Sequence, residues 1–157
     1  MIRFVARLLG LGLGAAALVA AQVLVGPRGL GEAAPDLFLA VGLAVVLRGR
    51  RGRGGGLLLG LGGLRSCFSI DPVLPTLGFF WLAGEGAVVV RNLFYGERPL
   101  VPAVLGLAAS FLAPLARSLG PSGVPPPPAT SWCLASATTG LATAALALGL
   151  SALSRRR

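Results

Sequence analysis

Residues 130–153 read TSWCLASATTGLATAALALGLSAL, a run of 24 residues without a charged side chain. A helix needs about 20 mainly apolar residues to cross a hydrocarbon core of roughly 30 Å, so this run is long enough to span a membrane. Three further runs have the same character, at residues 8–25, 72–94 and 100–119. Their only charged residues are Glu85, Arg91 and Arg117. Together the four runs predict an integral membrane protein built from helices.

The composition of the whole chain of 157 residues agrees with this interpretation. Hydrophobic residues make up 55% of the chain and charged residues only 12%, whereas about a quarter of a soluble domain is charged. The sequence has no histidine and only two cysteines, so it lacks the commonest general base and a cysteine-rich metal site. Ser66, Ser69 and Ser131 have no histidine or lysine to activate them as nucleophiles. We therefore expect a protein that is not an enzyme, with no catalytic residues, cofactor or metal.

Two weaker apolar segments lie between the first two long runs. Extended to residues 30–47 and 54–70, they are long enough for two short spans. A single re-entrant hairpin would instead place four connecting arginines inside the bilayer: Arg48, Arg50, Arg51 and Arg53. Each arginine at the centre of a bilayer costs at least about 2.5–3.5 kcal/mol. We therefore expect two spans here and six in all.

The distribution of arginines predicts how the six spans are oriented. Eleven of the fourteen arginines fall on one side of an alternating path, and only Arg28, Arg65 and Arg117 fall on the other. The positive-inside rule assigns the arginine-rich side to the cytoplasm. The expected fold class is an all-α polytopic membrane protein with six transmembrane helices and both termini in the cytoplasm. A single membrane domain, residues 1–157, contains all six spans, at residues 8–25, 30–47, 54–70, 72–94, 100–119 and 130–153.

The first run has a second interpretation, as a cleaved signal peptide. Arg3 and Arg7 precede it, and residues 19–21 (VAA) resemble a cleavage site. The run is longer than a typical signal-peptide core, so we expect it to be retained as the first span. Cleavage would leave the orientation of the other five spans unchanged.

Glycines recur at helical spacing in two of the expected spans. Gly10 and Gly14 lie in the first span, and Gly56 and Gly60 repeat the pattern in the third. Small residues at this spacing let two helices approach closely, so we expect these glycines to serve helix packing, either within the chain or in a dimer seam. Residues 10–15 also fit G-x-G-x-x-A, but a dinucleotide-binding site needs a strand before that motif.

The arginine-glycine run at residues 48–56 resembles an RNA-binding tail. Its place between two apolar segments favours a role in topology instead. Arginines near a bilayer surface attract anionic lipid headgroups by about 1 kcal/mol each. We expect Arg48, Arg50, Arg51 and Arg53 to set topology and contact anionic lipid, with membrane lipids and no nucleic acid as partners.

Glu85 lies near the middle of the fourth span, and a carboxyl group inside a membrane is a functional candidate by default. Trp81, Glu85 and Asn92 share one helical face, at spacings of four and seven residues. We expect this face to make a contact with another helix of the chain or with a partner protein. For Glu85 itself, a structural hydrogen bond to a neighbouring helix is favoured over a partner-binding or conformational role and over ion coupling.

Cys67 and Cys133 both fall near the outer face in this topology. The compartment outside a cell membrane is commonly oxidising, so a disulfide is chemically allowed there. The sequence contains no distance between the third and sixth spans, and an unpaired cysteine commonly behaves as a small apolar residue. Two free thiols are therefore the favoured expectation.

The order of these features resembles the MreD family of bacterial rod-shape-determining proteins over about residues 1–120. A basic start leads to a first span that ends near Gln22, and Pro35-Asp36-Leu37 opens a short span. An arginine-rich turn and a glycine-leucine-rich third span follow, and Asp71-Pro72 precedes the fourth. The stretch RNLFYGERPL at residues 91–100 is the most specific part of the match. The family often carries an acidic residue late in the third span, where this chain has Arg65.

The resemblance implies a function as well as a fold. It implies a non-enzymatic, multi-pass subunit of the cell-elongation (rod shape) complex in the bacterial inner (cytoplasmic) membrane. Such a subunit binds MreC and other elongation-complex proteins, and helps to couple the actin-like cytoskeleton to peptidoglycan synthesis. The MreD family is similar in fold to the substrate-binding subunits of energy-coupling-factor transporters. The alternative function is therefore a solute-binding membrane subunit of such a transporter.

Overall fold

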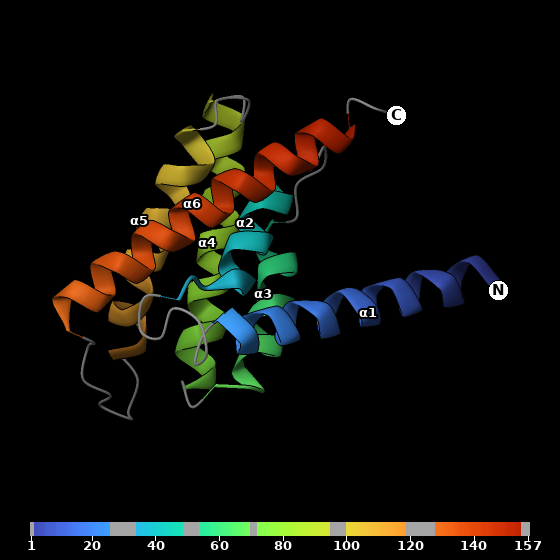
Figure 1. The fold of residues 1–157 in the computed structure, drawn as a ribbon, viewed down its shortest axis with the longest axis horizontal. Coiled ribbons are helices and arrows are strands. Elements are labelled where there is room, and N and C mark those ends of the chain that lie inside the picture. The colour runs from blue at the N-terminus through green and yellow to red at the C-terminus, as the bar shows by residue number, and fades with distance from the viewer. Residues whose placement is uncertain are drawn as a thin grey trace.

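The computed structural model describes residues 2–25, 34–48, 54–69, 72–94, 100–118 and 128–154. Within these residues the chain forms six α-helices and no strand (Figure 1). In chain order the helices are α1 (Ile2–Val25), α2 (Leu37–Arg48), α3 (Gly54–Ser66), α4 (Val73–Phe94), α5 (Leu100–Ser118) and α6 (Ala129–Ser154). The expected all-helical fold class is confirmed for this part of the chain.

The shortest helix, α2, is the centre of the fold. Eight of its twelve residues are buried, and Leu39 and Leu43 are fully enclosed. α2 contacts all five other helices, and its side chains form the apolar core together with Leu58 of α3 and Phe80 of α4. Around this centre, α3 packs most extensively on α4, and α5 on α6.

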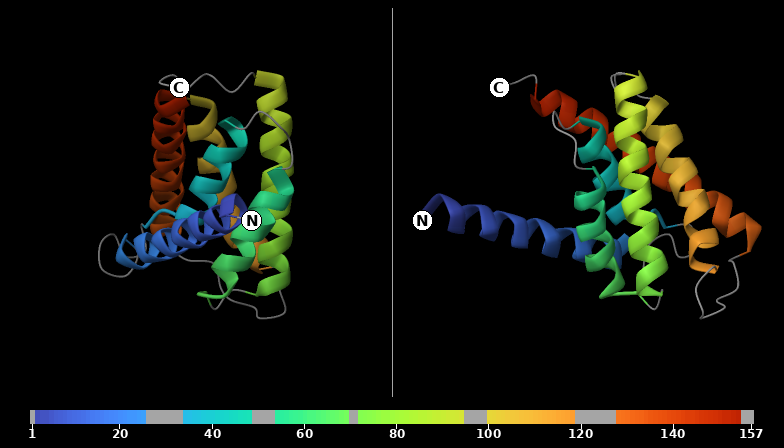
Figure 2. Two further views of the ribbon diagram at one scale, coloured as in Figure 1. Left: turned by 90° about the vertical axis from the view of Figure 1, so that its right-hand side faces the viewer. Right: turned by 180° about the vertical axis from the view of Figure 1, so that it is seen from behind.

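Helices α2 to α6 alternate in direction. The C-terminal ends of α2, α4 and α6 lie toward one end of the bundle, where α5 begins (Figures 1 and 2). α3 begins part-way along α4, next to Gly84 and Val88. α1 differs, because it lies at a steep angle to α4 and only its last turns reach the bundle, next to α2 (Figure 2). The expected first span is therefore a helix, but it does not lie alongside the others.

Two helices are shorter than the spans expected from the sequence. α2 begins at Leu37 rather than at residue 30, because residues 34–36 are not helical and Asp36 Oδ1 caps the helix by accepting the Leu39 N–H at 3.1 Å. α3 ends at Ser66 rather than at residue 70, and a turn follows it. At 1.5 Å per residue the two helices extend about 18 and 20 Å. Neither by itself crosses roughly 30 Å of hydrocarbon.

Two other helices have the length and apolar composition to cross a membrane. These are α4 and the Ala129–Leu153 part of α6. Only 22% and 28% of their most apolar stretches are buried inside the protein. Large side chains such as Leu74 on α4 (82% exposed) and Leu141 on α6 (70% exposed) face outward. Exposed apolar surface of this kind is typical of membrane or protein contact surfaces and is rare on soluble monomers.

Candidate functional site

A polar side chain from α1 holds the chain where it enters α2. Gln22 Nε2 donates a hydrogen bond to the carbonyl of Pro35 at 3.1 Å, and Gln22 Oε1 accepts the backbone N–H of Leu37 at 2.7 Å. The N–H groups at the start of a helix have no partner within the helix. Gln22 therefore ties α1 to α2 and supplies one of the missing partners.

Asp36 connects this entry to α3 and α6. Its Oδ2 pairs with Arg65 Nε at 2.9 Å, and the two side chains are only 15% and 16% exposed. Its backbone N–H donates to Thr139 Oγ1 at 3.0 Å. Asp36 and Arg65 thus join the entry to α2 to the end of α3. Pairing compensates part of the cost of removing the two charges from water.

Thr139 extends the same network to α5. Its hydroxyl accepts from the Asp36 N–H and from Ser110 Oγ at 3.3 Å, and it donates to the carbonyl of Ala135 at 2.7 Å. A hydroxyl has one donor and two acceptor positions, so every position of Thr139 is used. Thr139 is fully buried, and its contacts hold the start of α2 against α5 and α6.

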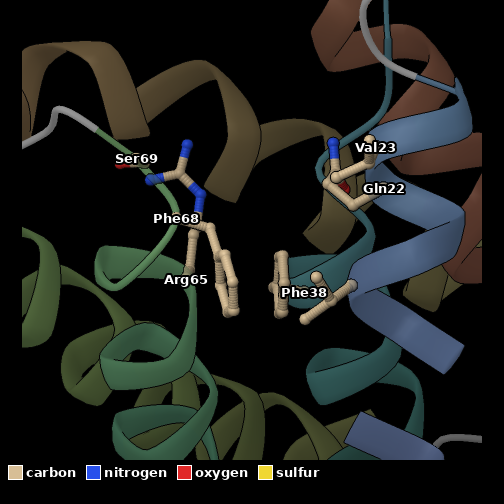
Figure 3. Close-up of a pocket in the computed structure, with 7 residues that line it drawn as sticks. Gln22, Val23, Phe38, Arg65, Phe68 and Ser69 are labelled. Atoms are coloured by element: carbon tan, nitrogen blue, oxygen red, sulfur yellow. The ribbon is translucent and has the colours of Figure 1, made fainter. Parts of the chain in front are cut away.

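Two cavities flank this network, and Gln22 and Arg65 line both. The larger, here called the entry cavity, has a volume of about 310 Å³. Its polar lining residues come from α1, α3, α5, α6 and the entry to α2: Gln22, Asp36, Arg65, Ser110, Ser131 and Trp132. The second has a volume of about 260 Å³. Figure 3 shows it between Arg65, Phe68 and Ser69 on one side and Gln22, Val23 and Phe38 on the other.

The wall of the entry cavity between α5 and α6 is built around Trp132. Its ring stacks on Phe111 with the centroids 4.7 Å apart, and its Nε1 donates to the Phe111 carbonyl at 2.9 Å. Ser131 Oγ donates to the carbonyl of Pro128 at 2.9 Å. These side chains are held in place by their own neighbours, so the wall is formed in advance of any ligand.

Glu85 lies at the other end of α3 and caps it. Its Oε1 accepts the N–H of Gly55 at 2.9 Å, one of the unpaired N–H groups in the first turn of α3. The Trp81 ring also packs at Gly55, because a side-chain carbon there would lie 2.7 Å from Trp81 Cδ1. The predicted contact of Trp81 and Glu85 with another helix is therefore present within the chain. Asn92 is exposed on α4.

The glycines that serve helix packing are not the expected ones. A carbon added at Gly10, Gly14, Gly56 or Gly60 would meet nothing within 4 Å among the described residues. Close packing of these glycines within that part of the chain is therefore not seen, and a dimer seam stays a prediction. The close approach is made by neighbours one or two positions away. In α3 and α4 a carbon at Gly84 would lie 2.6 Å from the Gly54 carbonyl carbon.

A second close approach joins α5 and α6. A carbon added at Gly106 would lie 2.8 Å from Thr143 Cβ, and one at Gly140 would lie 2.8 Å from the Ala103 carbonyl oxygen. Glycine at these two positions allows the backbones to come together. The most extensive helix pairs in the bundle are therefore both built on glycine contacts.

Only one of the four arginines expected at the lipid surface lies in the described part of the chain. Arg48 ends α2 and is half-buried, and its Nε has no hydrogen-bond partner among the described residues. Arg91 Nη1 donates to the carbonyl of Val46 at 3.1 Å, so a second guanidinium lies against the same helix end. Arg50, Arg51 and Arg53 lie outside the described residues.

The described residues offer few groups for chemistry. Among them, no three histidine, cysteine, aspartate or glutamate side chains come together where a metal could bind. Cys67 and Cys133 are free thiols, and both are exposed. The arrangement is suited to holding helices together and to binding a small polar molecule in the entry cavity.

Comparisons with known protein families, curated proteins and solved structures find no match for this chain.

Several residues of the entry network were not singled out from the sequence as a site. Gln22, Ser110, Thr139 and Trp132 lie far apart in the chain, and a single polar residue in an apolar run does not indicate its partner. One signal was present for Asp36 and Arg65, which are opposite charges near the ends of two short helices on the same side. Opposite charges placed in this way are candidates for an ion pair.

Proposed function

We propose that this chain is a multi-pass protein of the bacterial inner membrane, with six spans and both termini in the cytoplasm. The outward apolar faces of α4 and α6 support membrane insertion. α4 and α6 would cross the bilayer, and the short helix α2 would lie inside the bundle, surrounded by protein rather than lipid. The short helix α3 would pack along α4 with its other face outward. The arginines that follow α2, α4 and α6 in the sequence support a cytoplasmic position for these three stretches.

Reporter fusions test this topology. Fusions after Arg53, Arg98 and Arg157 are expected to report the cytoplasm, and fusions after Gly29, Ser69 and Ser122 the outer side. The same compartment for fusions after Arg53 and Ser69 would contradict the six-span path.

Within the membrane, the proposed role is that of a non-enzymatic subunit of the cell-elongation complex that binds MreC. The order of features and the residues 91–100 stretch, which resemble the MreD family, carry this proposal. The surface of α4 adds to it. Trp81 is 47% exposed although its ring also contacts α3, and the exposed Glu85 and Asn92 lie on the same face. An aromatic and two polar side chains on an apolar helix are suited to binding a partner helix.

Affinity purification from detergent, with identification of the co-eluting proteins, tests this role. We expect MreC to co-elute with the wild-type chain and to be lost or reduced by Trp81→Ala and Asn92→Ala. Leu93→Ala is the matched control, because Leu93 is 68% exposed on the same helix but lies about a third of a turn from Trp81. Absence of MreC from the wild-type eluate would contradict the proposal. Equal recovery of MreC with all three variants would show that this face of α4 is not the binding surface.

A further inference from the structure

The entry cavity is an unusual feature of an otherwise apolar bundle. The chain before α2 is not helical at residues 34–36. Hydrogen bonds to Gln22 of α1 and Thr139 of α6 hold this irregular backbone in place. Irregular backbone inside a membrane protein is tolerated where it is buried in protein or lines a polar cavity. Here it contributes Ala34 and Asp36 to the wall of a cavity of about 310 Å³.

The charges in this cavity are held in a fixed arrangement. Arg65 and Asp36 come from different elements and meet at 2.9 Å, and Asp36 is also fixed through its backbone to Thr139. An ion pair taken out of water commonly stabilises a protein less than apolar side chains of the same volume. A paired acid and base lining a cavity among apolar helices therefore point to ligand binding.

We propose that the entry cavity binds a small zwitterionic solute of amino-acid size. Arg65 offers a guanidinium to a carboxylate, and Asp36 offers acceptor positions to an ammonium beyond those used by Leu39 and Arg65. An anion alone would meet the Asp36 carboxyl, and a cation alone would meet the guanidinium. A molecule that carries both charges is complementary to the pair.

The size of the cavity limits the solute. Binding cavities for small molecules range from about 300 to 1,000 Å³, so the entry cavity lies at the lower end of that range. Ser110, Ser131 and Trp132 add two hydroxyl groups and an aromatic ring to the wall. This site goes beyond the proposed binding of MreC and does not depend on it. Solute binding would favour the alternative function, a solute-binding membrane subunit.

Tryptophan fluorescence can report binding directly. The chain has two tryptophans, so Trp81→Phe leaves Trp132, in the cavity wall, as the single reporter. The purified full chain in detergent would be titrated with glycine, L-glutamine and L-phenylalanine, and with propionate and propylamine as probes of one charge only. We expect a saturable change in emission at millimolar concentrations of at least one amino acid, and none with propionate or propylamine.

Two substitutions on α6 then locate the site. Ala135 lines the cavity, so Ala135→Leu should raise the dissociation constant at least tenfold by filling it. Ala137 is exposed two positions away, and Ala137→Leu should leave binding unchanged. If Ala135→Leu fails to fold by circular dichroism, Asp36→Asn takes its place with the same expected weakening.

Three results would overturn the proposal. The first is the lack of a saturable response to all three amino acids, which would leave the ion pair with a structural role only. The second is an equal response to propionate or propylamine. The third is unchanged binding in the folded cavity variant. None of these results bears on recovery of MreC, so failure of this site and failure of the proposed function can be told apart.

Discussion

Two sets of glycines in α3 and α4 have opposite surroundings. Gly54, Gly55 and Gly84 lie in the contact between the two helices, here called the α3–α4 seam, where an added carbon would collide with backbone or side chains. Gly56 and Gly86 are one or two residues away and have open space. Each residue turns a helix by about 100°, so close neighbours in sequence face different directions. Rotation of the helix, and not glycine content, therefore decides where helices approach.

The largest expected effect comes from filling the seam at Gly84. We expect Gly84→Leu to destabilise the protein by about 3 kcal/mol or more, because the new side chain meets the backbone of Gly54 and Gly55. Backbone cannot move aside as the end of a side chain can. The loss of stability is measured by heating the purified protein in detergent and monitoring its unfolding by size-exclusion chromatography.

Gly86→Leu is the matched control for this substitution. Gly86 lies on the other side of Glu85 in the same helix and is exposed, so we expect nearly wild-type unfolding. Equal destabilisation by Gly84→Leu and Gly86→Leu would contradict the difference in packing between the two positions.

The next effect concerns the hydrogen bond across the seam. Glu85→Leu removes the acceptor of the Gly55 N–H. We expect the free energy of unfolding to fall by only about 1 kcal/mol, because the Glu85 side chain is exposed. Glu85→Gln retains an acceptor oxygen and should unfold close to wild type. The two variants are compared by the same thermal assay. If Glu85→Gln lowers the stability as much as Glu85→Leu, the α3–α4 seam needs the carboxyl group itself.

A smaller effect of opposite sign is expected on the open face of α3. Alanine is preferred to glycine inside helices by about 1 kcal/mol or slightly less, and Gly56 and Gly60 have room for the added carbon. Gly56→Ala and Gly60→Ala should each raise the unfolding temperature slightly. Destabilisation by either would indicate that this face is covered, for example in a dimer seam, which cross-linking of the wild-type chain would then detect.

The smallest effect is expected at the thiols. Cys67 follows α3 and Cys133 lies in α6, and both are free and exposed, so Cys67→Ala should leave unfolding unchanged. Maleimide should label both thiols of denatured protein without prior reduction. Labelling that appears only after reduction would contradict the free thiols. It would show that a disulfide joins the end of α3 to α6.

The positions of the long helices followed closely from the sequence. The run at residues 72–94 became α4 (Val73–Phe94), and the run at residues 130–153 became most of α6 (Ala129–Ser154). In a long apolar run, the charged residues or prolines at its two sides mark where the helix begins and ends. α2 and α3 are shorter than expected because Asp36 caps the start of α2 and a turn follows Ser66 at the end of α3. Both are local features that the hydrophobicity of the two segments does not reveal.

The candidate site was predicted only in part. Glu85 stood out because it is a carboxyl in an apolar run, and the expected hydrogen bond to another helix is present. The Asp36–Arg65 pair and the Gln22 and Thr139 contacts were not predicted. Each links elements separated by many residues, and a single sequence holds no information on which elements meet.

The helical composition, the apolar character of the long helices and the grouping of the arginines can be read from the sequence, because each depends on residues close together in the chain. Tertiary structure decided which helix is central, which glycines pack and which polar side chains meet. α2 and α4 illustrate this, since both are strongly apolar, yet α2 is largely buried and α4 largely exposed. Apolar side chains favour leaving water, but hydrophobicity does not distinguish a protein interior from lipid, so only the packing of the other helices decides between them.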